Sequence, residues 1–285
     1  MSGPIVVGVD GSASALTAVR WAAEEAARHR APLELVHAYL LPRRGYPELV
    51  LTGHEVRDAF ERQGRQWLAD AADSVRDLVP EVRTSLVVDR PAAAMIAASR
   101  GARLVVLGSQ GLGGFSGLII GSVAVSVAAH GKSPVAIVRG AYRDTGPVVL
   151  GVDGEPAGEE AIAFAFAEAS VRGTTLVALL AWTALLAETP YAASLSVDWD
   201  EVEDQQRQLL AQRLAGWQQE YPDVVVERRV VRERPAKALL DAAHDARLLV
   251  VGSRGRGGFA GMLLGSTSQA LVYHAPCPLV VVRAD

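Results

Sequence analysis

The chain has 285 residues, of which 50% are hydrophobic and 21% are charged, so it is long and apolar enough to form two globular domains and is not a disordered chain. Its formal net charge of −4 argues against a nucleic-acid-binding surface, which normally has an excess of basic residues. The single cysteine, Cys277, excludes an internal disulfide, and we expect it to be a buried structural thiol in a reducing compartment.

Strands and helices are predicted to alternate along the first half of the chain. A β-rich run at residues 4–9 ends at Asp10 and Gly11, and Ser12 or Ser14 can cap the helix that follows. We expect strands at residues 4–9, 33–39, 82–88, 103–107 and 135–138, and helices at about 12–30, 55–78, 91–100 and 121–129. This alternation predicts a parallel sheet with helices on both faces.

The second half of the chain repeats the first. Residues 5–11 match residues 148–154, residues 89–92 match residues 233–236, and residues 102–108 match residues 246–252. Pro156 is expected at a helix start, and a long helix is expected around residues 202–221. The sequence therefore predicts a tandem duplication, with domains at residues 1–141 and 146–285.

A glycine-rich stretch occurs once in each half, at residues 108–122 and 252–266, between an aliphatic run and a helix-like segment. Glycines let the backbone come close to a ligand, and the free N–H groups of a helix start point toward its negative charge. In parallel sheets of this class, ligands bind beyond the carboxyl ends of the strands, where the strand order reverses. The pattern predicts a phosphate-binding loop in each half.

Familiar motifs do not explain these loops. Gly131-Lys132-Ser133 resembles the end of a P-loop, but it ends a helix instead of opening one, and we expect Gly131 to be a left-handed C-cap. The dinucleotide fingerprint is met only loosely by Gly255, Gly257 and Ala260. The sequence contains no Gly-x-Ser-x-Gly, HExxH or CxxC pattern, so no nucleophile elbow and no protein metal centre are predicted.

Both loops share one spacing, namely glycine, two residues, glycine, nine residues, and then Gly-Ser. Gly108, Gly111, Gly121 and Ser122 fill it first, and Gly252, Gly255, Gly265 and Ser266 fill it second. This spacing resembles the ATP-binding signature of the universal stress protein family, and the whole chain resembles a tandem-domain member of the mycobacterial and actinobacterial type. The alternative, that the glycines only form tight turns, explains one copy more readily than two matched copies.

The resemblance implies a five-stranded doubly wound sheet in each half, with strand order 3-2-1-4-5 and the two halves paired as a pseudo-dimer. It also implies one ATP site in each half, with Mg²⁺ as a companion. In the first half the implied binding residues are Gly8, Asp10, His37, Ala38, Gly108, Ser109, Gln110, Gly111, Leu112, Gly113, Gly114, Gly121, Ser122 and Val123. In the second half they are Gly151, Asp153, Leu180, Ala181, Gly252, Ser253, Arg254, Gly255, Arg256, Gly257, Gly258, Gly265, Ser266 and Thr267.

The family also implies a role for each group of these residues. The aspartate after the first strand of each half would contact the ribose or base. The alternative for Asp10 is a cap for the helix that follows it, and the two roles are compatible. Backbone groups at the end of the second strand would hold the adenine. His37 has only an apolar counterpart, Leu180, in the second half, so we expect no catalysis by it. The glycine loops and helix starts would hold the ribose and phosphates.

The two loops differ at two positions. Gln110 and Leu112 of the first loop become Arg254 and Arg256 in the second. Because arginine neutralises phosphate charge and bonds it bidentately, one hypothesis is that the second site holds ATP more tightly. The alternative is a solvated basic loop with no ligand.

The leading functional interpretation is an ATP-binding regulator of a stress response or of growth, and not an enzyme, with slow ATP hydrolysis at most. A second hypothesis is an adenylating enzyme of the same fold group, but such enzymes resemble this chain except for a Ser-Gly-Gly-x-Ser loop where residues 8–12 read Gly-Val-Asp-Gly-Ser. A third is an interaction scaffold that binds no nucleotide, which the intact glycine motifs disfavour.

Partners and location are expected from the same reasoning. The resemblance implies pairing through the last strands, at residues 135–138 and 279–282, a homodimer of tandem chains, and an unidentified protein partner. No nucleic-acid or membrane partner is expected. The first apolar run is too short for a signal peptide, and residues 176–187 are shorter than the roughly 20 residues of a membrane span, so a cytoplasmic location is expected.

Overall fold

A computed structural model describes residues 3–41, 53–111, 120–139, 142–155, 158–183, 198–255 and 263–283. The chain divides into two compact units, Met1–Ala141 and Tyr142–Asp285. None of the helices in these described ranges combines the length and the hydropathy that a membrane span needs.

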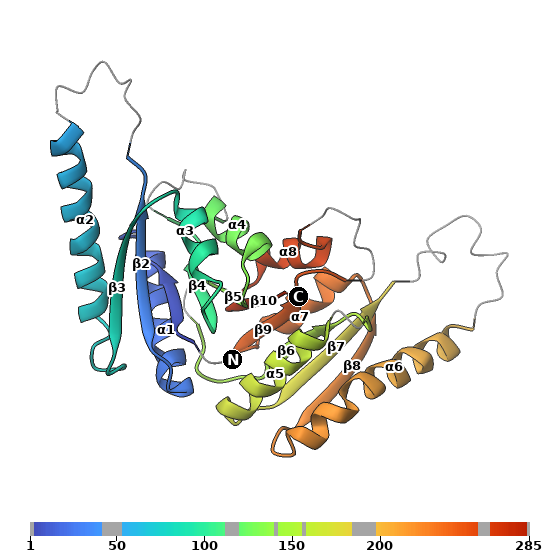
Figure 1. Ribbon diagram of the computed structural model, residues 1–285. Coiled ribbons are helices and arrows are strands. Elements are labelled where there is room, and N and C mark those ends of the chain that lie inside the picture. The colour runs from blue at the N-terminus through green and yellow to red at the C-terminus, as the bar shows by residue number, and fades with distance from the viewer. Residues whose placement is uncertain are drawn as a thin grey trace, which may run out of the picture. The chain divides into compact units, whose positions relative to one another are not determined.

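The first unit contains five strands and four helices in alternation (Figure 1). Their bounds are β1 Ile5–Gly8, α1 Ala13–His29, β2 Leu33–Tyr39, α2 Gly53–Asp73, β3 Val82–Val88, α3 Pro91–Ala98, β4 Leu104–Gly108, α4 Ser122–His130 and β5 Val135–Val138. The second unit repeats this order with β6 Val148–Val152, α5 Glu159–Arg172, β7 Leu176–Trp182, α6 Trp199–Glu220, β8 Val226–Arg232, α7 Pro235–Ala243, β9 Leu248–Gly252, α8 Ser266–His274 and β10 Leu279–Val282.

The strands of each unit pair in parallel with the same topology. In the first unit the order is β3-β2-β1-β4-β5, with Ile5 opposite Leu33 on one side and Leu104 on the other. In the second unit the order is β8-β7-β6-β9-β10, with Val148 opposite Leu176 and Leu248. The predicted doubly wound α/β fold and its strand order within each unit are therefore confirmed.

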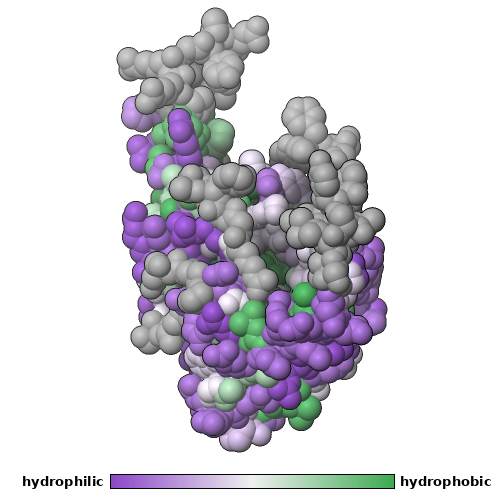
Figure 2. Space-filling model, turned by 90° about the vertical axis from the view of Figure 1, so that its right-hand side faces the viewer, coloured by the Kyte–Doolittle hydropathy of each residue, from purple (hydrophilic) through white to green (hydrophobic). Residues whose placement is uncertain are grey.

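Burial explains why these runs form central strands. All four aliphatic residues of β4 and all four of β9 are buried, as expected for strands covered by helices on both faces. The outer strands β3 and β8 contain only exposed and half-buried side chains. The side of the molecule that carries α6 and β8 is correspondingly hydrophilic over most of its area (Figure 2).

Sequence and structure differ at several element ends. Ser12, and not Ser14, caps α1, because its Oγ accepts from Ala15 N at 3.1 Å. Helix α2 ends at Asp73, about five residues before its expected end. The left-handed conformation expected at Gly131 is wrong, since its φ is −54°. Glycine is needed there for space, because a Cβ would lie 2.8 Å from the Val127 carbonyl oxygen. Pro156 lies outside the described residues.

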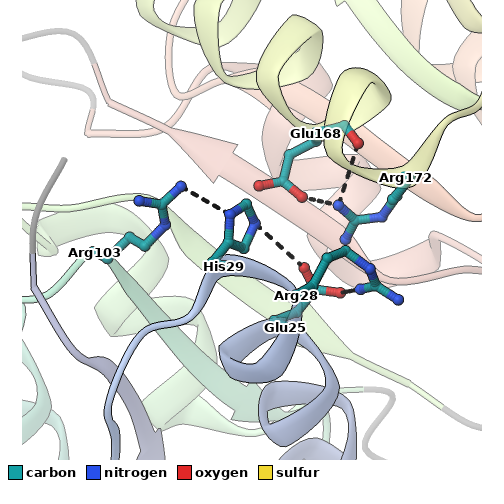
Figure 3. A network of polar contacts seen from close by, with 6 residues as sticks. All are labelled: Glu25, Arg28, His29, Arg103, Glu168 and Arg172. Carbon is teal, nitrogen blue, oxygen red and sulfur yellow. Dashed lines mark hydrogen bonds and ion pairs between the residues drawn. The ribbon is translucent and has the colours of Figure 1, made fainter.

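Each unit also buries one acidic side chain at the same place in its first helix. Glu25 is 2% exposed and Glu168 is 4% exposed. Glu25 accepts a hydrogen bond from Arg28, and Glu168 accepts one from Arg172, so each acid is paired with an arginine of its own helix (Figure 3). His29 contacts Arg103 at 2.9 Å between Nδ1 and Nη2. Both pairs lie near the carboxyl ends of their helices, α1 and α5.

Candidate functional site

The predicted crevice lies where the strand order of each sheet reverses. Strand β1 is hydrogen-bonded to β2 on one side and to β4 on the other, and β6 lies in the same way between β7 and β9. The chain leaves these neighbouring strands in opposite directions, so a crevice opens beyond their carboxyl ends. The predicted aspartates and glycine loops all follow these strand ends.

The two aspartates turn the chain after the first strand of each unit. Asp10 Oδ1 accepts from the N–H and the hydroxyl of Ser12 at 3.0 and 2.6 Å. Asp153 Oδ1 accepts from Glu155 N at 2.9 Å. Both carboxylates also face the glycine loop, since a Cβ on Gly111 or Gly255 would lie only 2.5 or 2.7 Å from the second carboxylate oxygen. These two glycines are therefore required by the close approach of the aspartates.

A shared backbone frame brings each glycine loop to the start of the following helix. In the first unit, Ser109 N donates to Val138 O at 3.0 Å and Gly121 N donates to Ser109 O at 2.7 Å. In the second unit the matching bonds are 2.7 Å for Ser253 to Val282 and 2.8 Å for Gly265 to Ser253. The N-caps of α4 and α8 are glycines without a side-chain cap, so the first-turn N–H groups remain available to an anion.

In the second unit these elements enclose a cavity of about 370 Å³, within the range of about 300–1,000 Å³ that is usual for ligand pockets. Nine of the predicted residues line it, namely Gly151, Asp153, Ala181, Gly252, Arg254, Gly255, Gly265, Ser266 and Thr267. Leu180 and Ser253 are buried and do not line it. Arg256, Gly257 and Gly258 lie outside the described residues.

Part of the cavity wall consists of residues that were not predicted from the sequence. Pro235 and Leu239 of α7, Leu179 of β7 and Ile162 of α5 also line the cavity. The Arg-Pro-Ala sequence at the start of α7 occurs in both halves and could have indicated this helix. The sequence is not, however, typical of any particular ligand or reaction. The remaining residues missed at the lining are Val152, Glu155, Gly158, Val251 and Ser268.

The cavity is apolar at one end and polar at the other. Leu179 and Leu239 lie at β7 and α7, on one side of β6. Arg254, Ser266 and Thr267 lie on the other side, at the end of β9 and the start of α8. Arg254 is exposed and makes no hydrogen bond or ion pair within the described part of the chain. The arrangement suits a ligand with a flat apolar group and an anionic group.

The first unit has the same loop frame. Gly8, Asp10, Ala38, Gly121, Ser122 and Val123 occupy the positions that the duplication predicts, whereas Leu112, Gly113 and Gly114 lie outside the described residues. A Cβ on Gly108 would lie 2.7 Å from the backbone of Ser14, so the start of α1 is packed against the loop. Gln110 is hydrogen-bonded to the same helix start.

His37 is buried in the layer between β2 and α2. Its Nδ1 lies 2.7 Å from Val9 O, and its ring meets Trp67 edge-on with centroids 5.2 Å apart. A Cβ on Gly64 would lie 2.6 Å from the imidazole ring. The side chain is therefore fixed by packing, and only its backbone lies at the strand end.

Comparisons with known proteins give one consistent result. The family model described as the universal stress protein family matches residues 1–139 and again residues 145–283. A universal stress protein from Mycolicibacterium smegmatis is 43% identical over 290 residues, covering 98% of this chain and 96% of the relative. One from Mycobacterium tuberculosis is 39% identical with the same coverage of both chains.

Solved structures agree on the fold. The crystal structure of a universal stress protein from Archaeoglobus fulgidus superposes with a TM-score of 0.73 at 18% identity and covers 100% of both chains. A protein of unknown function from Pseudomonas aeruginosa superposes with a TM-score of 0.64, also at 18% identity, covering 100% of this chain and 93% of that one.

Proposed function

Because the chain belongs to the universal stress protein family, we propose that it binds ATP at the carboxyl edge of each sheet and acts as a nucleotide-dependent regulator of a stress response or of growth. The regulatory output would be a change in association with a protein partner. Binding, without rapid turnover, is the activity proposed.

The cavity of the second unit is the observation that supports this proposal best. Its apolar end, with Leu179 and Leu239, offers a surface for the adenine ring. Its polar end offers a guanidinium at Arg254 and the uncapped N–H groups at the start of α8 for the phosphates. Asp153, which directly follows β6, offers a carboxylate to the ribose.

Mg²⁺ fits this site as a companion of the phosphates. Magnesium is usually held by one or two carboxylates together with substrate phosphates and water. Asp153 lines the cavity and supplies oxygen of this kind. Bound Mg²⁺ would neutralise part of the phosphate charge.

Arg254 gives a direct test. We predict that Arg254→Gln, which installs the residue of the first loop, weakens ATP binding to the second site by about 10- to 150-fold, because a charge-assisted bond contributes about 1.5–3 kcal/mol. Equilibrium dialysis of the full chain against ATP and Mg²⁺ measures this. Arg229→Gln is the matched control, since Arg229 is on the outer strand β8 and pairs with Glu227.

The same experiment separates binding from turnover. Release of ADP or AMP during dialysis, followed by chromatography, is expected to be negligible over the time of equilibration. Rapid release of AMP and pyrophosphate would favour the adenylating enzyme instead. Equal affinities of the wild type and Arg254→Gln would refute the role assigned to Arg254.

A further inference from the structure

Helix α6 is hydrogen-bonded to the turn that follows β6. The guanidinium of Arg213 donates to Gly154 O from two nitrogens, Nε at 3.0 Å and Nη2 at 2.6 Å. Gly154 is buried and has φ of 81°, a backbone conformation that favours glycine. Because a charged donor makes roughly twice as strong a hydrogen bond as a neutral one, these two bonds fix the place of the Gly154 carbonyl.

One helical turn further along α6, Trp217 bonds the start of α5. Its indole N–H donates to Glu159 Oε1 at 2.6 Å, and its ring stacks on Phe166 of α5 with centroids 6.4 Å apart. Arg213 and Trp217 are four positions apart, so they lie on the same face of α6. This face therefore contacts both Gly154, after β6, and Glu159, the first residue of α5.

The turn that Arg213 holds carries part of the cavity wall. Asp153, which directly precedes Gly154, lines the cavity, and a Cβ on Gly255 would lie 2.7 Å from Asp153 Oδ2. Arg213 is not among the described residues that line the cavity, and within the same part of the chain its guanidinium bonds only Gly154 O. Arg213 therefore acts on the cavity through the backbone of this turn and not by touching a ligand.

The first unit supports the matching turn in another way. Gly11 follows Asp10 with φ of 82°, and a Cβ on Gly11 would lie 2.5 Å from the ring of Trp67, on α2. Trp67 thus packs on its turn, whereas Arg213 is hydrogen-bonded to the turn of the second unit. Because hydrogen bonds from a planar guanidinium are directional, they fix the orientation of the peptide beside Asp153 as well as its position.

We infer that Arg213 is a positioning residue of the second ATP site, which holds Asp153 where its carboxylate meets the ribose, and that Trp217 supports it. This inference rests on the proposed ATP binding. A group that binds a ligand must be held to within about 0.5 Å by the residues behind it. Without the bonds to Gly154 O the turn and its carboxylate can shift, so the bond to the ribose weakens.

The ribose hydroxyls allow a specific test. Dideoxy-ATP has the base and the phosphates of ATP but offers no ribose hydroxyl to Asp153. The Gly111→Val background isolates the second site, because a side chain at Gly111 would meet Asp10 in the first. Calorimetric titration in the presence of Mg²⁺ then measures the affinity for each nucleotide. We expect ATP to bind more tightly than dideoxy-ATP by about 10-fold or more, the contribution of a hydrogen bond to a charged group.

Arg213→Met removes the donors but keeps a long side chain, and it should lower this preference for ATP to about 3-fold or less. Arg213→Lys keeps the charge but not the fork of donors, so it should retain an intermediate preference. Trp217→Phe keeps the stacked ring and loses only the N–H, so its effect should be smaller than that of Arg213→Met. Arg207→Met is the matched control and should change nothing, since Arg207 pairs with Glu203 and Asp204 within α6.

The preference for ATP over dideoxy-ATP separates positioning from other effects. A loss of positive charge or of stability weakens the binding of both nucleotides alike and leaves their ratio unchanged. A ratio near one while Arg213 is present, or equal ratios for Arg213→Met and Arg207→Met, would overturn the inference and leave ATP binding intact. If Arg213→Met does not fold, an unchanged ratio in Arg213→Lys would overturn it. No binding of ATP to a folded wild-type chain would instead overturn the proposed function, and the positioning role with it.

Discussion

The two glycine loops have the same spacing and the same backbone frame, yet they are held by opposite helices. In the first unit Gln110 bonds to serines at the start of α1, whereas in the second Gly252 bonds to Ser268 of α8. The cavity of the second unit is bordered by this loop. Among the described residues, the side-chain hydrogen bonds to the two loops therefore come from different helices.

The largest expected effect comes from removing the hydroxyl of Ser268, which bonds the second loop to α8. We predict that Ser268→Ala lowers the free energy of unfolding by about 1–2 kcal/mol, because the carbonyl of Gly252 loses its buried donor. Urea denaturation of the second unit measures the effect. Ser122→Ala, on the exposed start of α4, should change stability by less than about 0.5 kcal/mol. Equal effects of the two variants would contradict the anchoring role of Ser268.

A second contrast lies at the ends of the first helix in each unit. The C-cap residue of α1 is Arg30, with φ of 50°, whereas that of α5 is Gly173, with φ of 58°. A left-handed backbone costs a residue with a side chain about 1 kcal/mol but costs glycine almost nothing. Arg30→Gly should therefore stabilise the first unit by about 1 kcal/mol in urea denaturation. A loss of stability would show that the Arg30 side chain makes a compensating contact.

The third contrast compares a buried thiol with a buried hydroxyl. Cys277 is 7% exposed, as expected from the sequence, and the matching residue of the first unit is Ser133, 8% exposed. Each side chain contacts the carbonyl of the proline that follows it, at 3.6 and 3.4 Å. Cys277→Ser should therefore change stability by less than about 1 kcal/mol at pH 7, measured in the same way.

The wild type and the Cys277→Ser variant should differ in stability at high pH. Burial raises the pKa of Cys277 to about 12, above the value of about 8.5 in an unfolded chain. The folded state therefore favours the protonated thiol, so its stabilising contribution is complete below about pH 8.5 and is lost as the pH rises toward 12. The wild type should lose stability relative to Cys277→Ser above about pH 9. Parallel curves for both proteins would show that the thiol ionises freely in the fold.

Much of the fold could be predicted because its signals are local. The bounds of β2, β3 and β5 follow from aliphatic or alternating runs between proline and glycine residues. The duplication then placed two aspartates and two glycine loops at matching strand ends. Helix ends were less certain, because capping depends on which of two nearby serines reaches the backbone, as at Ser12 and Ser14.

The asymmetry of the sites could not be predicted from the motif. The Gly252 loop is held by Ser268, which lies 16 positions away, and the Gln110 loop is held by Ser14, which lies 96 positions away. A spacing pattern reports where glycines occur and not which distant hydroxyl faces them. Similarly, Leu239 of α7 joins the cavity wall only because α7 packs against β6 and β7.

The most direct test of the account is to count the adenine nucleotide bound to each chain. Purified protein is incubated with ATP and Mg²⁺, washed at increasing dilution, denatured, and the released nucleotide is quantified by mass spectrometry per chain. We predict close to two bound ATP per chain at saturation. At intermediate dilutions the count should stay near one ATP per chain, because the first unit has lost its nucleotide and the second has not. A count that falls smoothly from two to zero would contradict unequal sites, and a count of zero at saturation would contradict nucleotide binding altogether.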